Sequence, residues 1–335
     1  MLKLDNIKIV RGKNNNKVKG TSLYNVLIND SLIAYISLRL TDNEAYFMYK
    51  RINKKYYKYN YETSIIRLFC KFLTNKAKNI YCLNKMSSYL GEVGFIKENK
   101  ILKLDIDRLY FINNFKYLLF DVDDTLLSFE KSERKALTLA FNKYNIKATN
   151  KLINDYHLTN IKYWKMVEKG IISRDECLIK RFDEFLVKNN INVSSIDFEN
   201  TYRYYLNKQA FLMKDAKFVL KELEKNKQIY AITNGVYKTQ KYRVKKAKLD
   251  KFFIHSFISD EIKYNKPNKL FMDYVCAYIK NFSKDEALII GDSLSSDIKL
   301  GINSDVKTCY FNFKRLKNKD EIKPTYVIYS LKELI

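Results

Sequence analysis

The sequence predicts an α/β fold, in which a parallel sheet carries a long helical insertion, preceded by a small α+β domain. From Tyr117 onward, short apolar runs alternate with helical segments, and the stretch from Lys131 to about Lys214 is helical throughout. Before Tyr117, short strands follow one another with turn-like residues between them. A chain of 335 residues is also long for a single hydrophobic core, so we expect separate domains at residues 1–112 and 113–335.

The first domain is expected to start with three antiparallel strands. They are predicted at Tyr24–Asn29, Leu32–Thr41 and Glu44–Ile52, with turn-like residues between them. The apolar spacing then predicts a helix at Tyr61–Lys76, a strand at Asn79–Leu83, a short helix at Lys85–Leu90 and a last strand at Ile96–Ile106. The character of the sequence changes near Arg108–Asn114, which marks the domain boundary.

The second domain contains four short apolar runs, which we interpret as strands at Tyr117–Phe120, Gln228–Ile232, Ala287–Ile290 and Thr308–Phe311. Because helical segments separate them, they favour a parallel sheet with helices on both faces. The insertion at about 131–214 includes helical segments such as Lys135–Tyr144 and Arg174–Lys188. An all-helical insertion directly after the first strand predicts a cap domain.

The amino-acid composition limits the class of protein and the kinds of metal or catalytic site to be expected. Hydrophobic residues make up 47% of the chain, which is typical of a globular protein, and no long apolar run or secretion signal is apparent, so we expect a cytoplasmic protein. The five cysteines are widely spread without a C-x-x-C pair, which argues against a disulfide framework or a structural zinc site. With two histidines in the chain, a histidine metal cage is excluded. Catalysis must therefore depend on carboxylates and lysines.

A net charge of +25 raises the alternative of a nucleic-acid-binding protein. Lysine is spread over the whole chain, however, and does not gather in one segment. This distribution favours a solvated basic surface, which would still help to attract anionic substrates. We therefore expect neither a nucleic acid nor a membrane as the partner.

The first predicted strand of the second domain ends in two carboxylates, Asp121 and Asp123. In open α/β sheets ligands bind at the carboxyl ends of the strands, and strand alternation can place residues i and i+2 on one side. Asp121 is a candidate nucleophile toward phosphorus. Asp123 is a candidate acid that protonates the departing ester oxygen and later activates water. Taken alone, this run would favour an acidic turn that caps a helix.

Two further strand ends supply groups that suit a phosphate. Thr233, Asn234 and Gly235 follow the second strand, where a hydroxyl, an amide and backbone N–H groups at a helix start could hold a phosphate. By itself this tripeptide is more often a turn. Lys266 precedes a proline, and although a single lysine usually faces solvent, a phosphoryl group in transfer needs a cation.

Two acidic residues follow the third strand. Asp292 could share Mg²⁺ with Asp121 and the backbone carbonyl of Asp123, because magnesium prefers oxygen ligands from one or two carboxylates plus substrate and water. Asp297, one helical turn later, is expected to support Lys266 or Asp292 from behind the metal ligands. The expected cofactor is Mg²⁺.

In the order of these groups the sequence resembles the haloacid dehalogenase (HAD) superfamily: Asp121-Val122-Asp123-Asp124-Thr125, then Thr233, Lys266, and Gly291-Asp292 through Asp297. The resemblance covers about Tyr117 to Ile335. It implies a Rossmann-like sheet, a phosphoaspartate on the first Asp and acid/base catalysis by the Asp two residues later. True dehalogenases lack that second Asp, so its presence implies a phosphatase. The helical insertion matches the superfamily's type-one cap, which closes over the site and shapes specificity.

Within this superfamily the chain resembles the bacterial pyrimidine 5′-nucleotidases. The similar stretches include Ser259-Asp260-Glu261, Asn265–Phe271 and, in the insertion, Asn160, Tyr163-Trp164 and Arg181-Phe182. The resemblance implies that the partner is a small phosphate ester, a pyrimidine nucleoside monophosphate that the protein hydrolyses. A phosphatase of sugar phosphates or other small metabolites is the alternative.

Three residues of the insertion are candidates for a part in specificity. Trp164 could stack on a base or anchor the cap, and Asn160 could hydrogen-bond a pyrimidine edge or cap a helix. Arg181 is expected to pair with an acidic neighbour rather than with the substrate.

The first domain resembles the GNAT acetyltransferase fold in its order of strands and helices from Tyr24 to Ile106, and in the segment Leu32–Leu40. That family holds the acetyl-CoA pyrophosphate on a glycine-rich turn, because glycine lets backbone N–H groups approach the phosphates. The corresponding segment here, Tyr56–Tyr61, contains no glycine. We therefore expect a degenerate, noncatalytic GNAT-like domain, with a bifunctional acetyltransferase-phosphatase as the alternative.

Overall fold

The structure, a computed structural model, describes residues 7–12, 21–28, 31–41, 43–52, 66, 69–73, 76–83, 95–98, 101–105, 111–314, 316 and 321–335. The chain divides into two compact units, Met1–Asn114 with Ile328–Ile335, and Phe115–Val327. Within the described residues, none of the helices combines the length and the apolar character that crossing a membrane requires.

The first unit is built on a seven-stranded sheet in the order β1-β2-β3-β4-β5-β7-β6. Its strands are β1 (Ile7–Arg11), β2 (Ser22–Ile28), β3 (Ser31–Leu40), β4 (Glu44–Ile52), β5 (Asn79–Leu83), β6 (Ile96–Glu98) and β7 (Ile101–Asp105). Strands β4 and β5 pair in parallel, and the other neighbours pair antiparallel. Buried residues that alternate along the strands, such as Ile36 and Leu38 of β3, pack with Phe69 and Leu73 into one core.

Strands β2 to β5 lie where the sequence predicted strands, whereas two features of this unit differ from the prediction. The segment Ile96–Ile106 is not one strand: β6 folds back on β7, with Glu98 opposite Ile101, and apolar alternation alone does not reveal so tight a reversal. Strand β1, an edge strand paired with β2, was not predicted. The predicted helix Lys85–Leu90 and the segment Tyr56–Tyr61 lie outside the described residues.

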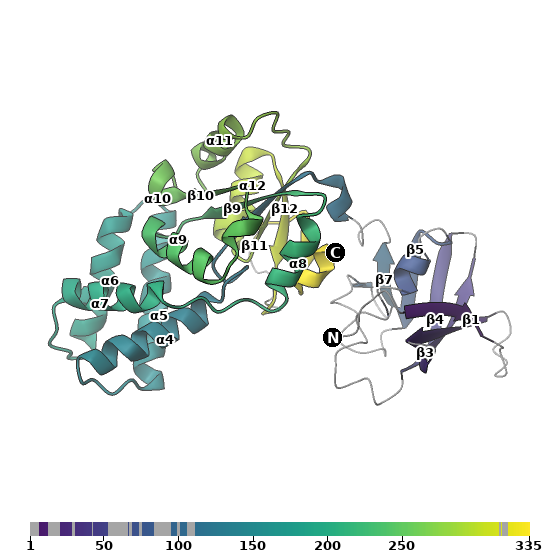
Figure 1. Cartoon of the computed structure of the whole chain (residues 1–335), viewed down its shortest axis with the longest axis horizontal. Helices are drawn as coiled ribbons and strands as arrows, with labels where there is room; N and C mark the ends of the chain where they lie inside the picture. The colour runs from purple at the N-terminus through teal and green to yellow at the C-terminus, as the bar shows by residue number, and fades with distance from the viewer. Residues whose placement is uncertain are drawn as a thin grey trace. The chain divides into compact units, whose positions relative to one another are not determined.

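The second unit is an α/β unit with a six-stranded sheet in the order β10-β9-β8-β11-β12-β13 (Figure 1). Its strands are β8 (Tyr117–Asp121), β9 (Gln228–Thr233), β10 (His255–Ile258), β11 (Ala287–Gly291), β12 (Lys307–Phe311) and β13 (Tyr326–Ile328). Strands β8 to β12 pair in parallel, which confirms the predicted parallel sheet. Every residue of the central strands β8 and β11 is buried, as continuous apolar runs require when helices cover both faces.

Helices follow the strands of this sheet in the predicted alternation. They are α8 (Ala216–Leu223), α9 (Tyr237–Lys246), α10 (Ser259–Ile262), α11 (Lys269–Tyr278) and α12 (Lys299–Ser304). Helix α9 starts directly beyond the end of β9, and its first backbone N–H, that of Tyr237, donates to Asp260 Oδ2 at 2.9 Å. Through this bond a side chain on another helix caps α9, because Val236 at its own N-cap position provides no side-chain oxygen.

Between β8 and α8 the chain forms four helices that gather beside the sheet (Figure 1). They are α4 (Phe129–Lys143), α5 (Asn150–Glu168), α6 (Arg174–Lys188) and α7 (Ser195–Asn207). Each begins after a hydroxyl side chain that accepts a backbone N–H, on Ser128, Thr149, Ser173 and Ser194. Their shared core is rich in stacked and tilted aromatic rings, such as Tyr156 on Phe182. We refer to α4–α7 as the helical insertion.

Candidate active site

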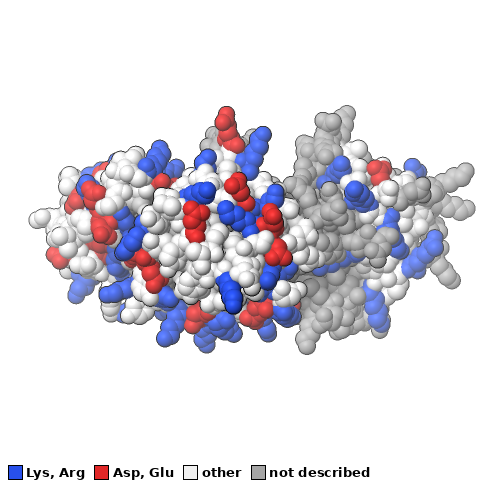
Figure 2. Space-filling model, turned by 90° about the horizontal axis from the view of Figure 1, so that it is seen from above, with Lys and Arg blue, Asp and Glu red and all other residues white. Residues whose placement is uncertain are grey.

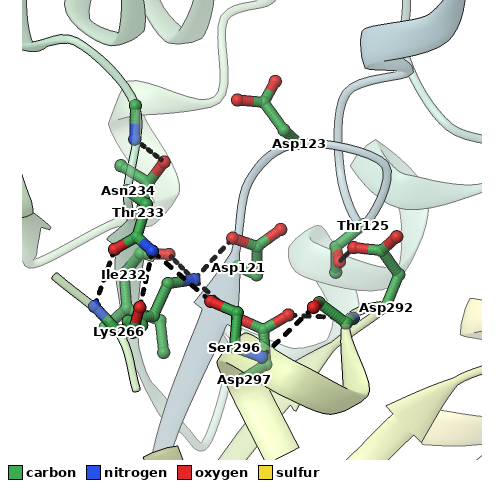
Figure 3. Close-up of polar contacts among 12 residues, drawn as sticks. Asp121, Asp123, Thr125, Ile232, Thr233, Asn234, Lys266, Asp292, Ser296 and Asp297 are labelled. Carbon is green, nitrogen blue, oxygen red and sulfur yellow. Dashed lines mark hydrogen bonds and ion pairs between the residues drawn. The ribbon is translucent and has the colours of Figure 1, made fainter. Parts of the chain in front are cut away.

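The site lies where the parallel strands end. Strands β9, β8 and β11 are neighbours in the sheet, and their last residues are Thr233, Asp121 and Gly291. Because parallel strands end at the same edge, the residues that follow them meet there. The structure thus brings Asp121, Thr233, Lys266, Asp292 and Asp297 together, although they are scattered over the chain (Figure 3).

Lys266 lies at the centre of this group, and only 1% of its surface is exposed. Its Nζ donates to Asp121 Oδ1 at 2.7 Å, to Asp297 Oδ1 at 2.5 Å and to the carbonyl oxygen of Ile232 at 3.2 Å (Figure 3). Burial by itself would lower the pKa of Lys266, but the two carboxylates raise it overall. The lysine therefore stays charged and directs that charge at Asp121.

Asn234 fixes the backbone of Lys266. Its Oδ1 accepts from the Lys266 N–H at 2.8 Å, and its Nδ2 donates to the Lys266 carbonyl at 2.8 Å. The Thr233 hydroxyl accepts from the backbone N–H of Gly235 at 3.0 Å. Since the Asn234 amide is engaged in this way, its contribution to a phosphate would come from its backbone N–H rather than from its side chain.

Three carboxylates face one another at the site. One oxygen from each of Asp121, Asp292 and Asp297 lies within 4.8 Å of the others. Burial, followed by repulsion from Asp121 and Asp297, raises the pKa of Asp292, and burial also raises the pKa of Asp121. If all three carboxylates were ionised, their negative charge would exceed the positive charge of the one lysine in a desolvated place, and a bound cation would favour this ionised state. An oxygen-only donor set of this kind fits a hard divalent cation such as Mg²⁺.

Asp123 points away from this cluster (Figure 3). Its Oδ1 pairs with Arg243 Nη1, and its Oδ2 accepts from Gln240 Nε2. Both partners lie on α9, and the sequence analysis named neither of them. Helix α9 carries several lysines besides Arg243, so a basic residue that is buried on a carboxylate cannot be told from solvent-facing ones by sequence alone.

Comparison with known proteins identifies the family to which this chain belongs. The sequence profile of the haloacid dehalogenase-like hydrolases matches residues 115–305. The chain belongs to this family. It is therefore a hydrolase, and the four ordered groups found in the sequence are placed by the fold at one sheet edge, in keeping with HAD-like hydrolases. The first unit lies outside the matched range.

Similar relatives include three bacterial proteins. The chain is 37% identical to HAD-hydrolase YfnB of Bacillus subtilis, over 67% of this chain and 95% of that protein. A crystal structure of YfnB, bound to magnesium and described as revealing interdomain movement, matches with a TM-score of 0.64 over 66% of this chain and 97% of that chain. The pyrimidine 5′-nucleotidases PynA of Streptococcus pneumoniae and YjjG of Escherichia coli are 33% and 28% identical, over 94% and 95% of their lengths.

The helical insertion of this HAD-like hydrolase places Asn160 differently from the expectation. Asn160 is 3% exposed and both ends of its amide are paired, Nδ2 with Glu133 Oε1 at 2.8 Å and Oδ1 with Arg181 Nη1 at 2.6 Å. It is thus part of the interior of the insertion, and its amide has no free group for a pyrimidine edge in this conformation. Arg181 also pairs with Glu199 at 2.9 Å, and Trp164 is half-buried.

Two contacts that the sequence did not suggest join the insertion to the sheet side of the site. Glu168, the last residue of α5, accepts from the Ser295 hydroxyl at 2.9 Å. Arg174, the first residue of α6, pairs with Asp260 Oδ1 at 2.7 Å. Both residues lie at the turn between α5 and α6, so this turn reaches the loop of Asp292 and Asp297 through Glu168 and helix α10 through Arg174.

Proposed function

We propose that this HAD-like hydrolase is a Mg²⁺-dependent phosphomonoesterase that forms a phosphoaspartate on Asp121 and acts on pyrimidine nucleoside 5′-monophosphates. The observation that carries the proposal is the placement of a buried, charged Lys266 between Asp121 and Asp297, with Asp292 beside them. A carboxylate nucleophile next to a fixed cation suits attack on a phosphoryl group, whose charge the cation stabilises.

The reaction would take place in two steps. A carboxylate oxygen of Asp121 attacks phosphorus, the bond between phosphorus and the ester oxygen breaks, and Asp123 donates a proton to the departing oxygen. Asp123 then takes a proton from water, which attacks the phosphoaspartate and releases inorganic phosphate. The Thr233 hydroxyl and the backbone N–H of Asn234, beyond the end of β9, would hold non-reacting phosphoryl oxygens.

Asp121, Asp292 and the backbone carbonyl of Asp123 are the groups that would hold Mg²⁺, with Asp297 behind them on Lys266 and on the backbone N–H of Ser293 at 3.1 Å. When bound, Mg²⁺ would neutralise part of the negative charge that gathers in phosphoryl transfer. The residues fit this ion because their donors are all oxygen and their excess charge is negative.

The substrate class is supported by the relatives named pyrimidine 5′-nucleotidase, which this chain matches over nearly their whole length. The helical insertion is proposed as a cap over the site, since Glu168 and Arg174 connect it to the loops that surround the carboxylates. A helical cap that closes on the site leaves limited room for a base. Trp164 is retained as a candidate contact to the base, whereas the Asn160 amide is paired inside the insertion with Glu133 and Arg181.

The test is a screen of phosphate esters with purified protein and Mg²⁺, with nucleoside monophosphates and sugar phosphates side by side. We expect dUMP, dTMP and UMP to be hydrolysed with higher kcat/KM than AMP and GMP. Asp121→Asn, as the control, should lose about four orders of magnitude of activity, because an amide is no nucleophile. A variant that kept a tenth of the activity would contradict the phosphoaspartate. Equal rates on AMP, GMP and dUMP, or higher rates on sugar phosphates, would contradict the assignment as a pyrimidine nucleotidase. The phosphoaspartate mechanism would be unaffected by that result.

For the first unit we propose a noncatalytic GNAT-like domain. The sheet of three antiparallel strands, β2 to β4, followed by helical residues and the parallel neighbour β5, supports the resemblance seen in the sequence. The lack of glycine in Tyr56–Tyr61, which lies outside the described residues, supports the absence of acetyl-CoA chemistry.

A further inference from the structure

Arg243 is one of the largest fully buried side chains described in this protein, with no exposed surface. Its guanidinium is shared among three groups besides an aromatic ring. Nη1 pairs with Asp123 Oδ1, Nη2 donates to the Ser132 hydroxyl at 3.4 Å and Nε donates to the carbonyl of Gln209 at 3.2 Å. The group also lies over the ring of Phe129, 5.6 Å from its centre. A planar guanidinium can serve several directions at once, which a lysine cannot.

The partners of Arg243 other than Asp123 lie on the two connections between the sheet and the helical insertion. Phe129 and Ser132 belong to the first turn of α4, where the chain enters the insertion, and Gln209 follows α7, where it leaves. These connections run side by side, since the Ser128 N–H donates to the Phe211 carbonyl at 2.7 Å. A movement of the insertion on these connections would therefore act on Arg243.

Gln240 completes the hold on Asp123. It lies three residues before Arg243 on α9, is 2% exposed and donates through Nε2 to Asp123 Oδ2. Each carboxylate oxygen of Asp123 thus has one fixed donor, and each keeps a further lone pair on which a proton can sit. We call Arg243 and Gln240 the Asp123 clamp.

The clamp is more than packing between helices. The carboxylate that pairs with Arg243 is Asp123, the second Asp of the motif after β8, and 27% of its side chain is exposed. The Gln209 carbonyl and the Ser132 hydroxyl are neutral, so the charge of this buried arginine is balanced by a carboxylate at the edge of the site. Asp121, by contrast, is held by Lys266, so the two carboxylates of the motif are oriented by separate cations.

We propose that Arg243, with Gln240, is a positioning residue that sets the orientation of the acid/base Asp123 and links this orientation to the connections of the helical insertion. The proposal rests on the proposed function, in which Asp123 protonates the leaving oxygen. Loss of Arg243 leaves Asp121 and Lys266 untouched, but it frees Asp123 to rotate. Proton donation to a basic leaving group should suffer most.

The test measures kcat/KM of Arg243→Gln with two aryl esters of similar size, phenyl phosphate and p-nitrophenyl phosphate. Phenolate is the more basic leaving group and depends more on the acid. We expect a loss of about 30-fold or more on phenyl phosphate and of about 3-fold on p-nitrophenyl phosphate, within the usual range of general-acid contributions. When Asp123→Asn is already present, Arg243→Gln should cost no more than about 3-fold on phenyl phosphate.

Arg181→Gln is the matched control, because it removes another buried arginine from an ion pair in the same unit without touching Asp123. It should lower both rates by the same factor. If Arg243→Gln does not fold, Gln240→Met, which keeps the length of the side chain, should show the same leaving-group dependence more weakly. Equal losses on both esters, or an undiminished loss in the Asp123→Asn background, would overturn the proposal. Failure of the proposed function would appear separately, as activity that survives Asp121→Asn.

Discussion

Lys266 and Asp292 both border Asp121, but their charges act on different partners. The ammonium group of Lys266 contacts Asp121 directly, whereas Asp292 faces it as a second carboxylate. A cation beside the nucleophile stabilises the transferring phosphoryl group, and a second carboxylate favours a bound cation. Removal of each should therefore give a different response to magnesium.

We expect Asp292→Ala to weaken Mg²⁺ binding and to regain part of its activity at high Mg²⁺, since Asp121 still supplies a carboxylate. Lys266→Ala should lose activity by about 10²-fold or more at every Mg²⁺ concentration, as for other groups that stabilise transition-state charge. Phosphate release measured across a Mg²⁺ titration checks both variants. A wild-type Mg²⁺ dependence for Asp292→Ala would remove this residue from the metal site.

A second residue-scale prediction concerns His157, whose Nδ1 lies 2.6 Å from Glu133 Oε2 inside the helical insertion. The hydrogen bond to Glu133 raises the pKa of His157, with Glu130 in the same direction and with burial and Lys314 opposing it. A raised pKa in the folded state stabilises the fold below the ordinary value of about 6.5, and this stability is lost as pH rises through the folded pKa.

The melting temperature should accordingly fall between pH 6 and pH 8 more in the wild type than in His157→Gln, whose amide can still donate to Glu133 but does not titrate. Thermal unfolding followed by circular dichroism at both pH values gives the comparison. Equal shifts in the two proteins would show that the His157 charge adds nothing to stability.

Single residues also show where sequence reasoning stops. Asp121 and Asp292 could be predicted because each follows an apolar strand, and their shared location follows from parallel pairing. Lys266 could be predicted from its place before a proline and from the order of groups shared with the HAD superfamily. The pairing of Asp123 with Arg243 could not be predicted, because Arg243 lies on a helix with several lysines and nothing in the sequence marks it as the buried basic residue. Asn160 appeared free for a substrate since nothing in the sequence places Glu133 beside it.

At the scale of elements, the close approach of the loop after β11 to the strand depends on glycine. A Cβ added to Gly291 would lie 2.2 Å from Asp297 Oδ2, and one added to Gly301 on α12 would lie 2.1 Å from the Thr308 methyl group. Both positions are crowded to a similar degree. Asp297 holds Lys266, however, while Thr308 belongs to the packing of β12.

We expect both Gly291→Ala and Gly301→Ala to lose about 1–3 kcal/mol of unfolding free energy through overpacking. Gly291→Ala should in addition lose about 10²-fold in kcat, because displacement of Asp297 moves Lys266 away from Asp121. Gly301→Ala should keep kcat within about 3-fold below its melting temperature. Denaturant unfolding and phosphatase assays on both variants test this, and similar kcat values for the two would argue against the role of Asp297 as support for Lys266.

Strands whose residues are nearly all buried could be predicted from the sequence, whereas short or half-buried strands could not. Strands β8, β9, β11 and β12 are almost fully buried and were found from their apolar runs. Strand β10 begins with the half-buried pair His255 and Ser256 and β13 is three residues long, so neither produces a strong apolar signal. The reversal between β6 and β7 was not predicted, because the apolar pattern of two short consecutive strands resembles that of one longer strand.

For the whole molecule, charge gives a general bias rather than a specific site. The net charge is +25, and on the face shown in Figure 2 Lys and Arg side chains lie among Asp and Glu side chains over the described surface. Such a surface raises the local concentration of anionic substrates without reading a nucleic-acid sequence. In the proposed function the buried carboxylates and Lys266, not the surface lysines, carry the chemistry.

The last prediction concerns the first unit as a part of the whole chain. In a GNAT fold the pyrophosphate of acetyl-CoA needs bare backbone N–H groups, and the corresponding segment here, Tyr56–Tyr61, has a side chain at every position. A left-handed backbone at such a residue costs about 1 kcal/mol or more, and each side chain shields its own N–H. The Kd for acetyl-CoA should therefore be about 1 mM or higher, which corresponds to a binding free energy of some 4 kcal/mol or less in magnitude.

Calorimetric titration of the full-length protein with acetyl-CoA measures this directly, and phosphatase activity of the same sample shows that the chain is folded. The control titrant is inorganic phosphate with Mg²⁺, which the second unit should bind whether or not the first unit has a ligand. Acetyl-CoA binding at micromolar concentration or tighter, not displaced by phosphate, would contradict the degenerate domain. It would favour a bifunctional enzyme in which the backbone of the first unit holds a pyrophosphate without glycine.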